Sequence, residues 1–207
     1  MESILILSED RKTIIGVKDK NVTLITIPNS VTTIGCYAFD GCSSLQSIDI
    51  PNSVTTIGYY AFGGCSSLPS INIPNSVTMI GNCAFCDCSS LQSINITKGN
   101  KHYESIDGIL FSKDLTCILK LPERKKLKEY TIPNSVTTIG DSVFNECSSL
   151  QSIHLHWTNL LDIKISDTTL RYRAEDCTLY IPPGTRWEYR HHSIWGNFKN
   201  IEIEKQE

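Results

Sequence analysis

The sequence predicts a mostly β repeat solenoid, a right-handed superhelix of stacked coils with parallel strands and few short helices. Three observations lead to this fold class. A unit of 23 residues recurs along the chain, each unit carries apolar residues at the alternating positions of a short strand, and a proline follows that strand. Because one such unit cannot bury its own apolar side chains, the units must stack against one another.

Four copies of the 23-residue unit are nearly the same in sequence. Residues 27–49 read IPNSVTTIGCYAFDGCSSLQSID, and residues 50–72 differ from them at only four positions. The other two copies are residues 73–95 and 132–154. Repetition this close predicts the same local structure in every copy.

Each unit contains one clear strand with a single buried face. Ile48 and Ile50 alternate with Ser47 and Asp49, so the isoleucines are predicted to point inward and the polar residues outward. Pro51 ends the strand because it has no N–H to donate to a ladder. A second short strand, closed by a glycine, and a tight arc with an inward Ala, Phe and Cys are expected to complete the coil.

The units divide one continuous domain into five segments with about six coils. These are an N-terminal partial repeat with a hairpin (1–26), three 23-residue repeats (27–95), a long repeat with a hairpin insertion (96–131), a further repeat (132–154), and a C-terminal repeat and cap (155–207). Met1 falls in the middle of a unit, so a shortened N-terminus is expected.

Two hairpins and an aromatic cap depart from the period. Residues 109–121 predict a protruding β-hairpin, and residues 6–17 match it in residue type. Near the C-terminus, Thr185 is expected to cap a short helix that runs through His191. Solenoids need atypical terminal coils to cover the open end of the core. The residues expected to provide that cover are Trp187, Tyr189, Trp195 and Phe198, followed by a last strand with Ile201 and Ile203.

The unit IPNSVTTIGxxAFxxCSSLxSIxIP resembles the BspA-type leucine-rich repeats (the Treponema pallidum class) of surface proteins from human-associated anaerobic bacteria. Residues 105–114 resemble the long repeat variant of that family, and residues 177–204 are similar to the closing segment of many members. The resemblance implies a leucine-rich-repeat superhelix, a cell-surface location and adhesion, to glycoproteins such as fibronectin and fibrinogen or between cells. It implies no catalytic residues.

Composition excludes several partners. Lys and Arg number 19 against 22 Asp and Glu, a net charge of −3, which lacks the basic surface that nucleic-acid binding needs. No apolar run approaches the roughly 20 residues of a membrane span. The run Ile4–Leu7 is too short for a signal peptide and follows Glu2, so a soluble chain without an export signal is expected, in contrast to the family's surface location.

Nine cysteines invite a redox or metal interpretation. Four of them recur at one position of the repeat and are predicted to form a buried ladder of small apolar side chains, Cys42, Cys65, Cys88 and Cys147. Cys83, Cys86 and Cys88 form a C-x-x-C-x-C cluster, but no second ligand pair lies at the spacing of a closed zinc site. We therefore predict no metal, and a Cys83–Cys86 disulfide stays open for an exported chain.

No enzyme is predicted. The sequence lacks the G-x-S-x-G, H-E-x-x-H, P-loop and G-x-G-x-x-G motifs, and no cofactor is expected. The pairs His154/His156 and His191/His192 are interpreted as surface residues rather than metal ligands.

The predicted binding surface is the outward face of the main strands. Its polar, nearly uncharged side chains suit an extended protein or glycan. They are Thr26, Ser47, Asp49, Ser70, Asn72, Ser93, Asn95, Glu129, Thr131, Ser152 and His154. A solvated face without a ligand is the alternative interpretation.

The insertion 96–126 is a second candidate surface, with Lys98, Lys101, His102 and Tyr103. Its basic run 124–126, offset by Glu123 and Glu129, is interpreted as solvated. Two functions of different class follow: a non-enzymatic adhesin-like binding module, or a structural, self-associating element with no foreign ligand.

Overall fold

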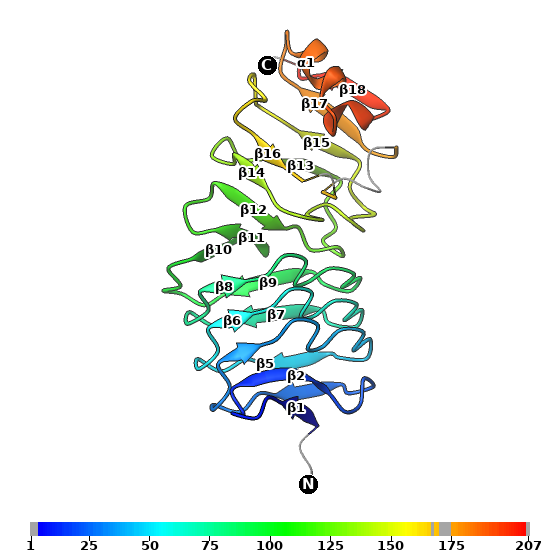
Figure 1. The fold of residues 1–207 in the computed structure, drawn as a ribbon. Helices are drawn as coiled ribbons and strands as arrows, with labels where there is room; N and C mark the ends of the chain where they lie inside the picture. The colour runs from blue at the N-terminus through cyan, green and yellow to red at the C-terminus, as the bar shows by residue number, and fades with distance from the viewer. Residues whose placement is uncertain (1–3, 167, 170–174, 206–207) are drawn as a thin grey trace.

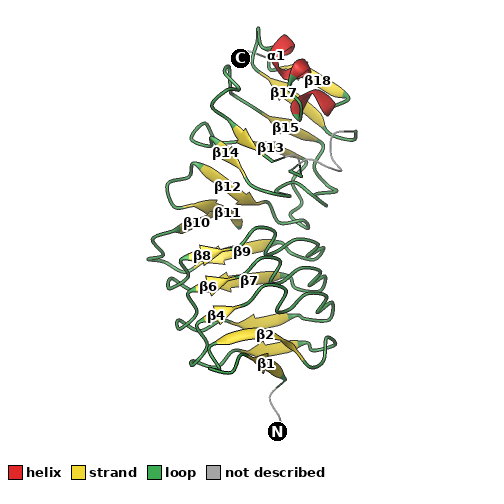
Figure 2. Ribbon diagram, in the orientation of Figure 1, coloured by secondary structure: helices red, strands yellow, loops and turns green. Residues whose placement is uncertain are grey.

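The computed structural model describes residues 4–166, 168, 169 and 175–205, which form an elongated solenoid of about eight turns (Figure 1). The termini lie at opposite ends, and strands alternate with loops along the whole length (Figure 2). The predicted mostly β solenoid with parallel strands is confirmed. The expectation of about six coils was too low, because the C-terminal segment adds two further main strands to the stack.

One side of the solenoid carries the main strands. They are β3 (Leu24–Thr26), β5 (Ser47–Asp49), β7 (Ser70–Ile73), β9 (Ser93–Ile96), β13 (Glu129–Thr131), β15 (Ser152–His154), β17 (Thr178–Ile181) and β18 (Asn200–Ile203). Paired main strands run parallel, as β3-β5, β7-β9 and β13-β15-β17-β18.

The remaining strands form two five-stranded sheets, in the orders β1-β2-β4-β6-β8 and β10-β11-β12-β14-β16. Their bounds are β1 (Leu5–Leu7), β2 (Thr13–Val17), β4 (Thr33–Ile34), β6 (Thr56–Ile57), β8 (Met79–Ile80), β10 (Tyr103–Ile106), β11 (Ile109–Ser112), β12 (Cys117–Lys120), β14 (Thr138–Ile139) and β16 (Lys164–Ile165). The two-residue strands are the short second strands that the repeat predicts.

The repeat sequence explains how each coil turns. After β5, the N–H of Val54 donates to the Pro51 carbonyl at 3.0 Å and closes the turn toward β6. After β6, Gly58 brings its backbone against the preceding coil, where a Cβ would lie 2.6 Å from the backbone nitrogen of Cys36. Only glycine permits that approach, which explains why a glycine follows β4, β6, β8 and β14.

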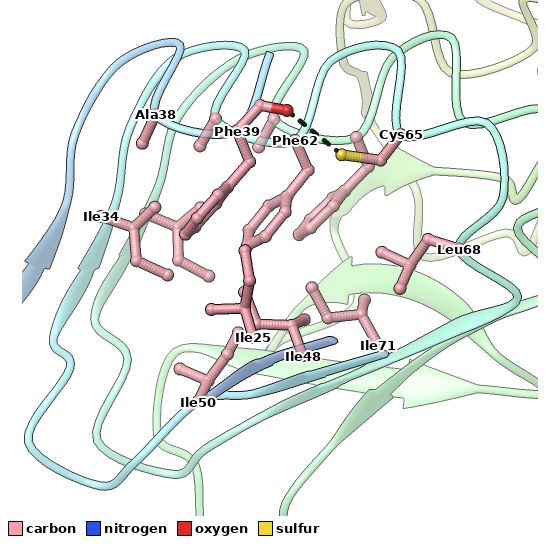
Figure 3. Close-up of a cluster of buried hydrophobic side chains, with 14 of the residues drawn as sticks. Ile25, Ile34, Ala38, Phe39, Ile48, Ile50, Phe62, Cys65, Leu68 and Ile71 are labelled. Carbon is pink, nitrogen blue, oxygen red and sulfur yellow. Dashed lines mark hydrogen bonds between the residues drawn. The ribbon is translucent and has the colours of Figure 1, made fainter. Parts of the chain in front are cut away.

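Stacked aromatic rings fill the core between the two strand sides (Figure 3). The ring of Phe62 lies between Phe39, at a centroid distance of 5.2 Å, and Phe85, at 5.6 Å, in both cases nearly parallel. The predicted cysteine ladder is confirmed, since all four thiols are buried. Three of them also donate to backbone carbonyls of the preceding turn, as Cys65 does to Phe39 at 3.3 Å and Cys88 to Phe62 at 3.1 Å.

The hairpin of the long repeat does not protrude, contrary to the sequence prediction. Phe111 of β11 and Ile118 of β12 are buried, and β12 pairs in parallel with β14, so the hairpin is a turn of the solenoid. Its apolar side chains would have been exposed to water on a protruding hairpin. The predicted match with the N-terminal hairpin is confirmed, because Ser8 donates to Asp10 and Ser112 to Asp114, each at 2.6 Å.

A buried ion pair lies where two apolar clusters meet. One cluster extends from Leu5 to Leu110 and the other from Ile109 to Ile201. The Lys120 ammonium lies 3.1 Å from the Glu123 carboxylate, and both side chains are at most 5% exposed. Glu123, which immediately precedes the basic run 124–126, is therefore buried rather than on the surface.

The protonation of this pair follows from burial and mutual attraction. Burial lowers the pKa of Lys120, but Glu123, Cys86 and Cys147 together outweigh burial and the pKa is raised. Burial raises the pKa of Glu123, and Lys120 opposes that rise. The 3.1 Å geometry favours the charged pair at neutral pH.

The C-terminal cap is formed mostly as predicted. Among the aromatic residues of this segment, Tyr189 of α1 (Arg186–His191), Trp195 of the 3₁₀ helix η1 (Trp195–Asn197) and Phe198 are buried. Two expectations were wrong. Trp187 is 69% exposed and stacks on His191 instead of covering the core, because it lies on the outer side of the helix. Thr185 precedes the helix but donates to the Pro182 carbonyl at 2.8 Å, so its hydroxyl does not cap the helix.

Phe62→Ala is expected to lower the free energy of unfolding by about 3–5 kcal/mol, because a buried ring is lost from the middle of the stack. Urea denaturation followed by circular dichroism measures this change. Met79→Ala is the matched control in a neighbouring coil, since the Met79 side chain is exposed, and it should change stability by no more than about 0.5 kcal/mol. A loss below 1 kcal/mol for Phe62→Ala would contradict the importance of the ring stack.

Glu123→Gln is expected to destabilise the protein by about 3 kcal/mol, because it leaves the Lys120 ammonium buried without a countercharge. The same denaturation experiment measures it. Glu129→Gln removes an exposed carboxylate nearby and should be close to neutral. Equal stability of the two variants would show that the buried pair is not required.

Candidate binding face

The main strands place every predicted site residue on one side of the solenoid. Exposure alternates along each strand, so that in β5 Ser47 and Asp49 are exposed on either side of the buried Ile48. Eight of the predicted residues are exposed, namely Thr26, Ser47, Asp49, Ser70, Asn72, Asn95, Glu129 and Thr131. Ser93, Ser152 and His154 are half-buried. The predicted inward and outward pattern is thus present, and it aligns equivalent residues of paired coils.

The face is not one continuous sheet, however. Pro69 takes the place held in the previous repeat by Gln46, whose N–H donates to the Thr23 carbonyl at 2.8 Å. Proline has no such donor, and β5 and β7 are not paired in the ladder. A second interruption follows β9. There the turn between β10 and β11 places the Gly108 carbonyl where it accepts the N–H of Ile94 at 2.9 Å.

These interruptions leave two patches. The N-terminal patch comprises the outward residues of β3, β5, β7 and β9, and the C-terminal patch those of β13, β15, β17 and β18. In the N-terminal patch, the Asn95 side chain donates to the Asn72 side chain at 3.0 Å. Both side-chain amides keep further donors and acceptors that a ligand could use. In the neighbouring pair of strands, Asp49 lies beside Thr26 in register. Apart from the exposed Leu24 of β3, this patch presents short polar side chains at the spacing of parallel strands, about 4.8 Å.

The C-terminal patch has a different chemistry. The His154 ring stacks on Tyr180 at 4.5 Å with an angle of 6° between the planes, and its Nδ1 lies 3.0 Å from a Glu204 carboxylate oxygen. Ser152 contacts the other ring nitrogen at 3.1 Å. His154 is therefore held in place by three neighbours rather than free in an exposed slot.

Sequence reasoning ended the binding face at His154 and missed Tyr180 and Glu202. Both follow the same rule, because Tyr180 pairs with His154 across one ladder and with Glu202 across the next. The signal was present in residues 178–181, where Thr and Tyr alternate with Leu and Ile. The loss of the 23-residue period concealed it.

The insertion also differs from expectation. A hollow of about 190 Å³ lies over residues 96–100, Tyr103 and the ion pair of Glu104 with Lys113. The hydrogen bond from the Lys113 ammonium lowers the pKa of Glu104. Tyr103 is not a free surface residue, since its hydroxyl accepts the N–H of Ile80 at 2.8 Å.

Residues 4–166 and the other described positions contain no group of three or more His, Cys, Asp or Glu side chains suited to hold a metal ion. Within the same residues, no helix has the length and apolar character that crossing a bilayer takes.

Comparison with known proteins identifies the repeat. A family model described as BspA type leucine rich repeat region matches residues 17–123 and 122–166, in six copies. No curated protein matches the chain in sequence.

Solved structures with the same fold come from several bacteria. The pneumococcal vaccine antigen PcpA matches with a TM-score of 0.64 and 22% identity over 88% of this chain and 47% of that chain, so this chain spans about half its length. A leucine rich cell surface protein of Faecalibacterium prausnitzii A2-165 matches with a TM-score of 0.61 and 23% identity, over 89% of this chain and 60% of that one. The leucine rich repeat protein of Treponema pallidum matches with a TM-score of 0.50 and 22% identity, over 91% of this chain and 93% of that one.

Replacing Asp49, Asn72 and Asn95 together by alanine is expected to lower the free energy of unfolding by less than about 1.5 kcal/mol, because all three side chains are exposed. Thermal and urea denaturation check this. A larger loss would mean that the outward amides support the fold, and the triple variant could not then serve as a binding probe.

Proposed function

Because the chain belongs to the family of BspA-type leucine-rich repeat proteins, we propose that it is a non-enzymatic scaffold that binds an extended protein or glycan on the outward face of its main strands. The supporting observation is the register of that face. Equivalent polar side chains project from paired coils at regular spacing, as Asn72 and Asn95 do. An extended ligand with its own repeating polar groups matches such a row better than a small apolar molecule does.

The N-terminal patch is the better candidate for the contact. Its amides and hydroxyls are largely exposed, whereas His154 in the C-terminal patch already contacts Tyr180, Glu204 and Ser152. Binding there would not require an existing cluster to be broken. Two of the similar structures are named as a vaccine antigen and a cell surface protein, which favours an adhesin-like role for this chain as well.

A second candidate function is end-to-end self-association. The first coil exposes Ile6 (40%) of the edge strand β1 and Ile15 (54%) of β2, apolar side chains that a second solenoid could cover. In that case the outward sheet face would be solvated surface.

Biosensor binding to immobilised matrix glycoproteins, plasma glycoproteins and glycans tests the first function. Asp49→Ala, Asn72→Ala and Asn95→Ala together should weaken binding at least about tenfold, since each lost polar contact costs on the order of 1 kcal/mol. The matched control changes asparagines of the turns, Asn29→Ala, Asn52→Ala and Asn134→Ala, which are also exposed.

Undiminished binding by the face variant would exclude the N-terminal patch as the site. If no ligand bound at all, the binding proposal would fail, and sedimentation at increasing concentration would test self-association. An oligomer that Ile15→Lys dissociates would support that second function.

A further inference from the structure

Two cysteines in the arc of the third repeat lie on one tight turn. The N–H of Cys86 donates to the carbonyl of Cys83 at 3.0 Å, as Gly63 does to Tyr60 in the preceding repeat at 3.0 Å. A turn closed in this way holds its first and fourth Cα atoms within about 7 Å. Disulfides bridge Cα atoms about 4.4–6.8 Å apart, so the backbone already provides the separation that a bond between these residues needs.

The preceding repeat shows that side chains at these two positions meet. There, the ring of Tyr60 occupies the space beside Gly63, and a Cβ on Gly63 would lie 1.9 Å from it. Glycine leaves room for the ring. In the third repeat both positions are cysteine, and both side chains line one small cavity. The side chains therefore point toward one another, as a disulfide requires.

The long repeat opens a small cavity beside this pair. Its loop from β12 to β13, residues 121–128, is shorter than the corresponding loop 140–151 of the next repeat and cannot fill the same arc. The cavity is about 40 Å³ in volume, and its lining includes Cys83, Cys86, Lys120 and Asp141. Cys83 is half-buried, whereas Cys86 is only 6% exposed. An incoming reagent would thus meet Cys83 first.

The surroundings make the two thiols chemically different. The hydrogen bond from the Cys86 thiol, and secondly the Ser142 hydroxyl 3.7 Å away, lower the pKa of Cys83 to about 6. Lys120 also favours the Cys83 thiolate, while burial and Asp141 oppose it. The same hydrogen bond, together with burial, raises the pKa of Cys86. Because Cys83 is also the more exposed of the two thiols, it is the nucleophile at neutral pH, and the buried Cys86 keeps its proton.

We propose that Cys83 and Cys86 form a thiol–disulfide exchange site that reacts with low-molecular-weight disulfides. The Cys83 thiolate attacks one sulfur of the disulfide RSSR, which forms a mixed disulfide and releases RS⁻. Cys86 then loses its proton to that thiolate or to water and attacks the Cys83 sulfur, which releases the second RS⁻. Two electrons pass from the protein to RSSR, and the products are a Cys83–Cys86 disulfide and two RSH after protonation.

Peptide mapping by mass spectrometry after reaction of the reduced, full chain with glutathione disulfide tests the site. The wild type should form the Cys83–Cys86 disulfide, with the ladder cysteines still reduced because they are buried. Cys86→Ser should accumulate a glutathione adduct on Cys83, and Cys83→Ser should form no adduct on Cys86. Cys36→Ser, which removes an exposed thiol elsewhere, is the matched control and should leave the pair's reaction unchanged.

A rate measurement on the wild type covers the case in which a variant does not fold. At pH 6, Cys83 should react with glutathione disulfide about tenfold faster in the folded chain than in urea, because its larger thiolate fraction outweighs the lower nucleophilicity of a less basic thiolate. A wild type in which both cysteines stay reduced while Cys36 gains glutathione would overturn the proposal. So would an equal rate in the folded and unfolded chain.

Discussion

Stacking of inward side chains between successive turns is the interaction on which the rest of the structure depends. A single coil has no interior, and Phe62 is buried only because Phe39 and Phe85 lie on either side of it. The backbone follows the same spacing, since the N–H of Phe62 donates to Ala84 in the next turn at 2.8 Å. The outward residues inherit this spacing, so the regular rows of the candidate binding face are a consequence of how the core stacks.

The long repeat is where this stacking changes, and several distinctive features occur together there. The apolar core divides into two clusters at residues 109–110, and the buried Lys120–Glu123 pair lies where the shortened loop 121–128 begins. The hairpin turn at Gly108 interrupts the main strands, and the same shortened turn leaves the cavity beside Cys83. All of these features lie in one turn, which carries extra hairpin strands and a shortened arc.

The sequence correctly predicted the features that the repeat period determines. It did not predict the features that depend on contacts with residues distant in the chain. The alternation around Ile48 and the position of Cys65 were enough to predict which side chains face inward. Nothing near Glu123 in sequence shows that the arcs on either side leave it buried, because that depends on the length of loop 121–128 relative to its neighbours. On the candidate face, the 23-residue period predicted the outward residues up to His154. Tyr180 lies beyond the last copy of the repeat, so only the alternation of polar and apolar residues in its strand could have identified it.

The proposed binding face and the dithiol site are physically separable. Figure 3 shows why, since the arcs that carry Phe39 and Cys65 lie across the core from Ile25, Ile48 and Ile71 of the main strands. The turn at Cys83 already holds the two cysteines at bonding separation, so a disulfide would need little movement of the backbone. The stacked rings of Phe39, Phe62 and Phe85 lie between the two sides, and packed cores resist gradual deformation. Oxidation of the pair should therefore leave the spacing of Asn72 and Asn95 unchanged, and ligand binding on that face should not depend on it.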